Sequence, residues 1–249
     1  MTFWDSIVTW FDGVKAEFIM NFIDKSRWKL LLTGLGNTLI ISLMACLMGI
    51  VIGVVIAVIR STWENQGHHM KPSPGKTVLS IFNRICSMYT TIIRGTPVVV
   101  QLLLIYYVIM TWSSDGVLIA SVAFGINSGA YVSEIIRGGI MSIEKGQMEA
   151  GRSLGLNYIQ TMWYIIAPQV LKNVLPTLAN EFIVLLKETS ISGYVAVMDL
   201  TFAGNRIRGV TFSPLMPLLA VAIIYLILVM FFTKLVSKLE RRLRQSDIR

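Results

Sequence analysis

The chain has 249 residues, of which 54% are hydrophobic and only 14% are charged, and its formal net charge is +8. Soluble domains carry about 25% charged residues, so this composition excludes an ordinary water-soluble core. Several apolar runs reach the roughly 18 residues that indicate a membrane-spanning helix. We therefore predict an all-α integral membrane protein.

Residues 1–32 carry aromatic and aliphatic side chains at helical spacing, among them Trp10, Phe18 and Phe22. Asp5 and Asp12 stand where a secretory signal needs positive charge, so we do not expect a cleaved signal peptide. The segment is expected to be an amphipathic helix lying in the membrane interface. A packed core helix is the alternative.

The hydropathy pattern predicts five membrane spans within residues 33–238, followed by a basic tail at 239–249. The spans are expected at about 38–59, 78–110, 117–138, 168–187 and 215–236. Gly49 and Gly53 in the first span form a GxxxG pair, which permits another helix to approach closely.

The second expected span contains its own interruption. Proline removes a backbone donor and disfavours helix at the preceding residue, so Gly95–Thr96–Pro97 predicts a bend at 95–97. Broken backbone inside a membrane is tolerated only where protein or a wet cavity satisfies its polar groups. Residues 188–213 are expected to form a polar loop between the last two spans.

Five spans would place the two termini on opposite sides of the membrane. Twenty Lys and Arg residues can be assigned to a side; 14 fall on the side of the tail and 6 on the other. Because cytoplasmic segments are enriched in Lys and Arg, we predict an external N-terminus and an internal C-terminus. The tail charge then reflects topology, and no nucleic-acid partner is needed.

The polar segment 139–162 separates the third and fourth expected spans and would face the cytoplasm. A turn of small and polar residues at 155–157 divides it into two short amphipathic pieces. Such a hairpin can lie flat on a membrane surface and present one face to a partner outside the membrane.

We find no sign of a catalytic, metal or nucleotide site. The PGKT run at 74–77 has Met70 where a phosphate-binding loop needs its first glycine, and no strand precedes it. The adjacent pair His68 and His69 lacks further ligands. Cys46 and Cys86 have no metal-ligand spacing.

The hairpin carries the residues of a known motif: Glu149, Ala150 and Gly151, then Gly155, Ile165 and Pro168. This pattern resembles the EAA loop of bacterial ATP-binding-cassette importer permeases, with Gly151 and Ala167 as departures from it. Three further stretches resemble permeases for polar amino acids: RGTPVVVQLLLIYY at 94–107, GAYVSEIIRGGI at 129–140 and LKETSI at 186–191.

The resemblance covers about residues 33–238 and implies the type I importer permease fold. It further implies a second permease subunit, identical or homologous, two cytoplasmic ATPases that hold the ATP and magnesium, and an external amino-acid-binding protein. The location implied is the bacterial cytoplasmic membrane. The cargo would be a polar or cationic amino acid such as arginine, histidine, lysine, glutamine or cystine.

The resemblance also assigns a role to the hairpin, which would dock as a short coupling helix in a groove on the ATPase. Glu149 and Arg152 are expected to make charged contacts there, while Ala150 and Leu154 pack into the groove. Gly151 belongs to the same motif. Gly155 would permit the tight turn, because glycine has no Cβ.

Polar residues in the spans are candidates for the cargo path, because an amino acid needs partners for its carboxylate and its ammonium group. Gln101 lies seven residues past Arg94 and is expected on the same helical side. The candidates are Arg94, Gln101, Asn127, Tyr131, Glu134, Asn180 and Glu181. The alternative is that Glu134 and Arg137, or Glu181 and a lysine, merely pair between helices.

Two other functions remain open at this level. A stand-alone, ion-coupled secondary transporter or channel would work without ATP. A membrane sensor would signal through the basic tail. The EAA pattern argues against the first, and the tail is more typical of a topology determinant.

Overall fold

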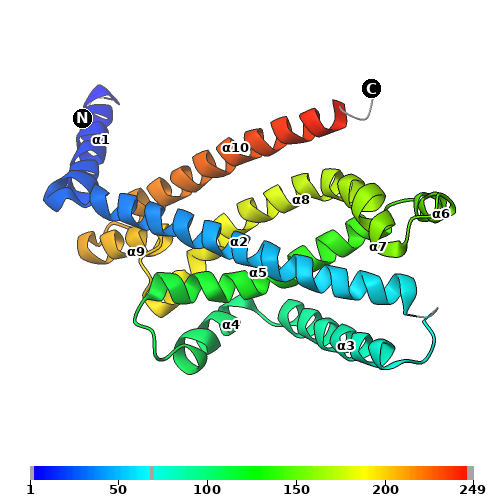
Figure 1. Cartoon of the computed structure of the whole chain (residues 1–249). Helices are drawn as coiled ribbons and strands as arrows, with labels where there is room; N and C mark the ends of the chain where they lie inside the picture. The colour runs from blue at the N-terminus through cyan, green and yellow to red at the C-terminus, as the bar shows by residue number, and fades with distance from the viewer. Residues whose placement is uncertain (1–2, 68–69, 246–249) are drawn as a thin grey trace.

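The computed structural model describes residues 3–67 and 70–245, and all regular structure within these residues is helical (Figure 1). Three helices are long and apolar enough to cross a membrane, namely α2 (Trp28–Gln66), α5 (Gly116–Met141) and α10 (Leu215–Gln245). The prediction of an all-helical membrane protein is confirmed for the described residues.

A bent helix pair lies where the second span was expected. It consists of α3 (Pro74–Gly95) followed by α4 (Val98–Leu104) and η3 (Ile105–Ile109), with an angle of 108° at the break. If this pair is one span, the described chain has up to four candidate spans. The bend falls at the predicted Gly–Thr–Pro sequence.

The fourth expected span coincides with α8 (Ala167–Glu188), which begins after a short π-helical segment, η4 (Met162–Ile166). α8 carries four charged residues and is not among the helices apolar enough to qualify on composition. Its burial pattern is one-sided, because Val170, Val174 and Ile183 are buried, whereas the polar stripe formed by Asn173, Thr177 and Asn180 is exposed.

The α2–α5 contact is the most extensive between any two elements of the described chain. The two helices can approach this closely because α2 has glycines where it meets α5. A Cβ on Gly49 would lie 2.7 Å from Ser128 Oγ, and one on Gly53 would lie 2.4 Å from Val132 Cγ1. No real Cβ contact is that short, so the GxxxG pair does what its spacing predicts.

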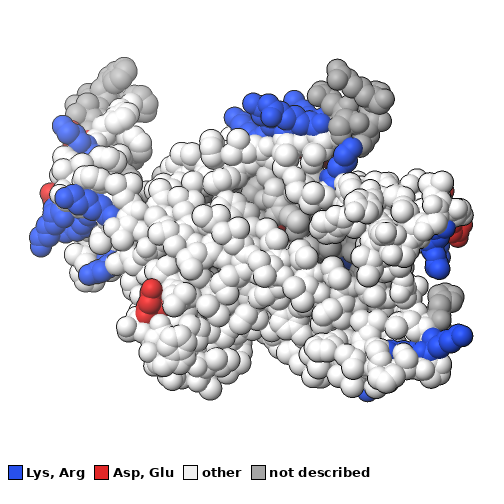
Figure 2. All heavy atoms as spheres, in the orientation of Figure 1, with Lys and Arg blue, Asp and Glu red and all other residues white. Residues whose placement is uncertain are grey.

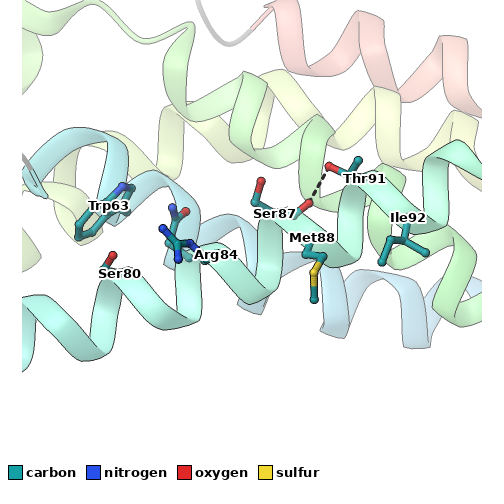
Figure 3. A pocket seen from close by; sticks show the side chains of 8 residues that line it. Trp63, Ser80, Arg84, Ser87, Met88, Thr91 and Ile92 are labelled. Atoms are coloured by element: carbon teal, nitrogen blue, oxygen red, sulfur yellow. Dashed lines mark hydrogen bonds between the residues drawn. The ribbon is translucent and has the colours of Figure 1, made fainter.

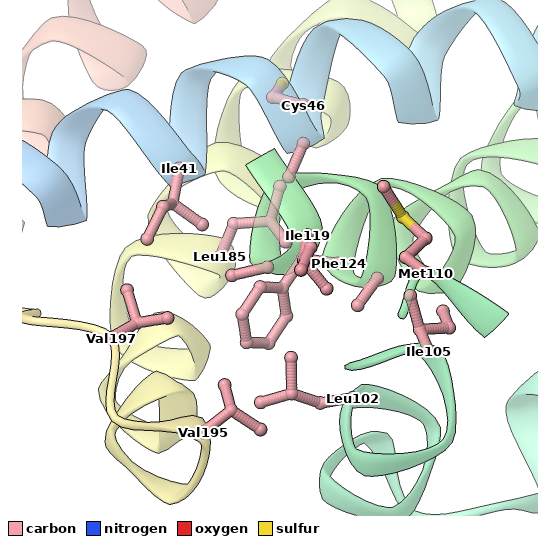
Figure 4. Packing of buried hydrophobic residues seen from close by; sticks show 13 residues of the cluster. Ile41, Cys46, Leu102, Ile105, Met110, Ile119, Phe124, Leu185, Val195 and Val197 are labelled. Atoms are coloured by element: carbon pink, nitrogen blue, oxygen red, sulfur yellow. The ribbon is translucent and has the colours of Figure 1, made fainter. Parts of the chain in front are cut away.

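The largest buried cluster lies where α2, α4, α5, α8 and the 3-10 segment η5 (Thr189–Val195) meet (Figure 4). Phe124 of α5 is fully buried at its centre, beside Leu102, Leu185 and Val195. Residues far apart in the sequence thus share one core. This core fixes the broken segment α4 against the side of α5.

Residues 188–213 were expected to form a polar loop, and that prediction is wrong. They contain η5 and the helix α9 (Leu200–Thr211), which Asp199 caps by accepting hydrogen bonds from the backbone of Thr201 and Phe202. Leu200, Ala203 and Ile207 are fully buried. α9 is held because one face packs on α2 and α10, although its other face is polar.

The first helix, α1 (Phe3–Phe18), continues into η1 (Ile19–Ile23) and a sharp turn at η2 (Asp24–Ser26). Trp10 and Phe11 are more than half exposed, as the expected interfacial position requires. Asn21 of η1 anchors this N-terminal segment to the rest of the chain, because it is buried and its side-chain amide donates a hydrogen bond to the hydroxyl of Ser213. Whether the helix lies in a membrane interface stays a prediction.

Lys and Arg show at both ends of the molecule and along its upper edge over the C-terminal half of α10, and most of the remaining visible face is uncharged (Figure 2). α1 and α9 lie at one end, whereas the C-terminal part of α10 and the segment around α6 (Lys145–Ser153) lie toward the other (Figure 1). An uncharged band between charged ends is the distribution that a membrane-spanning bundle requires.

Replacing Gly53 with alanine tests the α2–α5 contact. The new Cβ would overlap Val132 and the backbone of Ser133, so we expect a loss of about 1–3 kcal/mol in stability. Gly36→Ala, in the same helix but with no atom within 4 Å of the added Cβ, is the matched control. Thermal unfolding in detergent measures both; equal midpoints would contradict the close contact.

Candidate functional site

The polar segment between α5 and α8 folds as a helical hairpin. α6 (Lys145–Ser153) is followed by a turn and by α7 (Tyr158–Thr161). Gly155 has a φ of 84°, a conformation that strains any residue with a Cβ, so the predicted glycine turn is present. Asn157 then starts α7 through a reciprocal capping box with Gln160.

Gly151, the departure from the EAA pattern, has a structural cause. It is buried in the hairpin, and a Cβ at this position would lie 2.5 Å from Thr161 Cγ2 and 3.0 Å from Ile165 Cδ1. α6 therefore packs more closely on the following segment than an alanine would allow. The swap tightens the hairpin and leaves its outer face unchanged.

The outer face of the hairpin is exposed and mixed in character. Glu149, Ala150 and Arg152 are exposed, and Leu154 is 80% exposed at the tip. Three further large side chains are at least 69% exposed beside it, namely Ile159, Trp163 and Tyr164. The sequence reasoning did not assign these three residues. An apolar tip flanked by charges is typical of a protein docking surface.

A pocket of about 400 Å³ separates the hairpin from the end of α2. Glu64 and Asn65 of α2 line one wall, while Glu149, Arg152 and Tyr158 line the other. Burial raises the pKa of the Tyr158 hydroxyl, so it stays protonated at neutral pH. The hairpin is therefore close to α2 as well as to the helices that it connects.

Glu134 lies at the centre of an ionic network between α2, α3 and α5. It pairs with Arg60 and with Arg137, the latter at 2.8 Å, and lies 4.0 Å from Arg94. Arg137 also pairs with Glu64 at 3.3 Å. Glu134 therefore ties α5 to α2 and α3, and its contact with cargo stays a prediction.

Gln101 and Asn127 hold the bend rather than facing a cavity. The side-chain amide of Gln101 donates to the carbonyls of Ile93 and Thr96 at 2.8 and 3.2 Å, and it accepts from Asn127 at 2.9 Å. Both side chains are more than 90% buried. They satisfy the backbone groups that the break leaves unpaired, so their hydrogen bonds are already used.

The bend also separates two residues that the sequence placed together. Gln101 and Arg94 were expected on one helical side, but the chain turns by 108° between them. Gln101 meets Asn127 instead, while the Arg94 guanidinium lies over the ring of Tyr131 at 5.4 Å. The expected juxtaposition is wrong because seven-residue spacing describes a continuous helix only.

The remaining candidates come from three helices: Arg94 from the end of α3, Tyr131 from α5, and Asn180 and Glu181 from α8. Tyr131 and the side chain of Arg94 are partly exposed, at 38% and 46%. Glu181 of α8 accepts a hydrogen bond from Ser128, one turn before Tyr131, and Asn180 beside it is exposed. A cation, an aromatic ring and a carboxylate thus occur along one accessible stripe.

A second polar groove continues along α8. It has a volume of about 420 Å³ and lies between α8 and the C-terminal part of α10. Thr177 and Asn173, one and two turns before Asn180, line it. The exposed polar stripe of α8 therefore runs from Asn180 toward the end of the molecule that holds the hairpin.

No cluster of three His, Cys, Asp or Glu residues suited to a metal ion occurs in the described residues. His68 and His69 lie outside the described residues. Cys46 and Cys86 are free and buried on different helices. The chemistry of the described site is thus that of ion pairs, hydrogen bonds and apolar contacts.

The chain matches a known protein family and is similar to several known proteins. The family model described as "Binding-protein-dependent transport system inner membrane component" matches residues 76–245. The glutamine transport system permease protein GlnP of Escherichia coli K12 is 39% identical over 168 residues, which are 66% of this chain and 77% of that protein. The arginine transport system permease protein ArtQ of Bacillus subtilis 168 is 38% identical over 166 residues, 66% of this chain and 76% of that protein.

Solved structures agree in fold. A chain from the crystal structure of an amino acid ABC transporter with histidines has a TM-score of 0.76 at 38% identity, covering 89% of this chain and 98% of that one. The MetNI methionine ABC transporter in an inward-facing form has a TM-score of 0.73 at 20% identity, which supports the fold alone. Fold and site thus define a membrane component of a transport system. The chain belongs to the family of binding-protein-dependent transport system inner membrane components.

Removing the charge of Glu134 tests the ionic network. In Glu134→Gln, the guanidinium groups of Arg60 and Arg137 lose their shared carboxylate inside the bundle, so we expect a destabilisation on the order of 3 kcal/mol. Glu17→Gln, on the exposed surface of α1, is the charge-matched control and should change stability by less than about 0.5 kcal/mol. Indistinguishable unfolding curves for the two variants in detergent would exclude a stabilising network.

Proposed function

We propose that the chain is the permease subunit of an ATP-driven importer for polar amino acids. The single observation that carries this proposal is the exposed hairpin with its EAA-type sequence, attached to a bundle of the binding-protein-dependent family. Relatives named for glutamine and arginine transport support an amino acid as cargo. The chain itself forms the path, and ATP hydrolysis occurs in a separate subunit.

The assembly contains two permease subunits, two cytoplasmic ATPases and an external binding protein. We propose an external N-terminus and an internal C-terminus in the bacterial cytoplasmic membrane, with five crossings that include α8. The Lys and Arg distribution supports this orientation, as does the position of the hairpin toward the same end as the C-terminal part of α10 (Figure 1). α8 crosses because its polar stripe faces the path rather than lipid.

Coupling takes place at the outer face of the hairpin. Leu154 enters an apolar groove of the ATPase together with Ala150. Glu149 and Arg152 are exposed and also line the pocket that faces α2, and their charged ends pair with charges at the rim of the ATPase groove. ATP changes the separation of the two ATPases, and a ligand shifts a conformational equilibrium only through its differential affinity for the two states. The docked hairpins transmit that movement to α5 and α8 as rigid bodies.

Cargo contacts the accessible stripe formed by Arg94, Tyr131, Asn180 and Glu181. Arg94 offers a cation for the cargo carboxylate, while Glu181 offers an anion for an ammonium or guanidinium group. Glu134 and Gln101 position the stripe from behind, the first by holding Arg94 near α5 and the second by fixing the bend. Asn127 supports Gln101.

A stand-alone, ion-coupled transporter is the competing function. It predicts uptake by this chain alone in liposomes that contain no ATPase, driven by an ion gradient. The ATP-driven importer predicts uptake only when the ATPase, ATP and the binding protein are all present. The exposed apolar tip at Leu154 favours the second, because a solitary transporter would have no partner to cover it.

Docking of the hairpin is tested at its turn. Gly155→Val forces a β-branched residue to a φ of 84°, which costs about 1–3 kcal/mol locally and misaligns the tip. We expect the ATPase that co-purifies with the permease to fall by about tenfold, with a parallel loss of transport. Gly146→Val in α6, where nothing lies within 4 Å, is the control. Unchanged assembly in Gly155→Val would refute the docking role.

The cargo stripe is tested by removing its anion. In Glu181→Gln, we expect the apparent affinity for a cationic amino acid to fall by about tenfold, because a charge-assisted hydrogen bond is lost. Affinity for glutamine should change much less. Uptake of labelled arginine and glutamine by the complete importer in proteoliposomes measures both. If Glu181→Ala and Asn180→Ala leave uptake and selectivity intact, cargo passes elsewhere.

A further inference from the structure

A groove of about 540 Å³ lies on the outside of the bundle, between the end of α2 and the length of α3 (Figure 3). Trp63 of α2 stands at one end of it, beside Ser80 and Arg84 of α3. Met88 and Ile92 lie farther along α3. Neither the coupling hairpin nor the cargo stripe uses any of these residues.

The polar end of the groove carries positive charge without a partner. Arg84 is exposed and forms no ion pair within residues 3–67 and 70–245, whereas Arg60 and Arg137 are both paired with carboxylates. A second pocket of about 400 Å³ shares Trp63 and Ser80 with the groove and adds Lys76. Lys76 lines this adjoining pocket and donates a hydrogen bond to the carbonyl of Met70 at 2.9 Å, and the described lining of both pockets offers no carboxylate to neutralise Arg84 or Lys76.

A hydrogen bond between α2 and α3 shows how far the polar end of the groove lies along the two helices. Arg60, which ends the apolar run of α2, donates to Thr90 of α3 at 3.3 Å, so these residues lie at one level. Arg84 lies six residues before Thr90, about 9 Å farther out at 1.5 Å per helical residue. Trp63 lies about one turn beyond Arg60 in the same direction. Both therefore stand at the depth of lipid headgroups, where tryptophan is enriched.

The other end of the groove is apolar and points toward the membrane centre. Met88 and Ile92 are 59% and 53% exposed, and the hydroxyl groups of Ser87 and Thr91 lie between them and beside them. Along α3, the cation of the groove lies only at its outer end, whereas Met88 and Ile92 supply aliphatic surface farther in. This order matches an amphiphile with an anionic head and a hydrocarbon tail.

We propose that this groove binds an anionic phospholipid. Its phosphate accepts hydrogen bonds from the Arg84 guanidinium and the Ser80 hydroxyl, Lys76 adds to the attraction, and an acyl chain lies along Met88 and Ile92. Charge complementarity selects this occupant over a second protein copy, which would have to bring a carboxylate into the headgroup layer. With the orientation proposed above, the lipid belongs to the inner leaflet.

The test measures retained lipid on the complete, purified importer. The complex is equilibrated in mixed micelles that hold phosphatidylglycerol and phosphatidylcholine in equal amounts, and bound lipids are quantified by mass spectrometry. Wild type should retain phosphatidylglycerol preferentially. In Arg84→Gln this preference should fall by about fivefold, as expected for one basic residue near an anionic surface. Arg84→Lys should keep most of it.

Lys71→Gln is the charge-matched control, because Lys71 is exposed on the loop before α3 and lines neither pocket. If Lys71→Gln lost as much preference for phosphatidylglycerol as Arg84→Gln, the proposed site would be refuted. Ser80→Ala supplies a second variant with little risk to folding, and it should weaken retention in the same direction. An unchanged preference in both Arg84→Gln and Ser80→Ala would likewise refute the proposal.

Two further outcomes identify a different occupant. If millimolar inorganic phosphate displaces the lipid, the groove is a site for a free anion rather than for a phospholipid. If Ser80→Cys forms a disulfide between two permease copies, a second copy covers the groove. Either result overturns the proposal, and neither depends on which amino acid is transported, because the measurement needs no cargo.

Discussion

The close contact between α2 and α5 determines where nearly every functional group lies. Gly49 and Gly53 bring the two backbones together, so that Arg60 of α2 reaches Glu134 of α5. In a membrane, apolar side chains gain little by leaving lipid for protein, and helix association depends on close packing and on polar contacts. Both are present here on one interface. Larger residues at the two glycine positions would separate the ion pair as well as the helices.

The second constraint is the broken segment, where the membrane forbids unpaired backbone groups. Gln101 compensates by donating to the carbonyl of Ile93 at the end of α3 and to that of Thr96 in the break, and by accepting from Asn127 of α5. The same polar side chains that looked like cargo ligands are thus required by the fold itself. Arg94, at the end of α3, is left facing Tyr131, and it is the break that separates it from Gln101.

Much of this arrangement follows from sequence patterns that report local physics. The Gly–Thr–Pro bend, the glycine pair and the turn at Gly155 each depend on backbone geometry within a few residues, and each is present. α9 was missed because the half-buried Asn205 and the exposed Arg206 and Arg208 mask an apolar stripe. Leu200, Ala203, Gly204 and Ile207 recur at helical spacing and could have revealed it.

The roles of the ionisable residues could not be predicted from local sequence patterns. A carboxylate on a span can bind cargo or pair with a neighbouring helix, and the choice depends on distances between segments far apart in the sequence. Glu134 faces three arginines, whereas Glu181 accepts a hydrogen bond from the hydroxyl of Ser128 and has no ion pair within the described residues. Both residues look alike in the sequence. Only their partners separate a structural carboxylate from one that is available to a ligand.

In the proposed mechanism, the contacts around the hairpin determine how its movement is transmitted to the cargo path. Met148 of α6 packs against the cluster of Ile166, Val170 and Val174, which joins the hairpin to α8, and Ile140 of α5 packs there too. Packed cores are bistable rather than continuously deformable, so such a joint transmits displacement instead of absorbing it. The ionic network from Glu64 through Arg137 to Glu134 ties α2 to the same end of α5. In the proposed mechanism, a movement of the hairpin would therefore carry α2, α5 and α8 together.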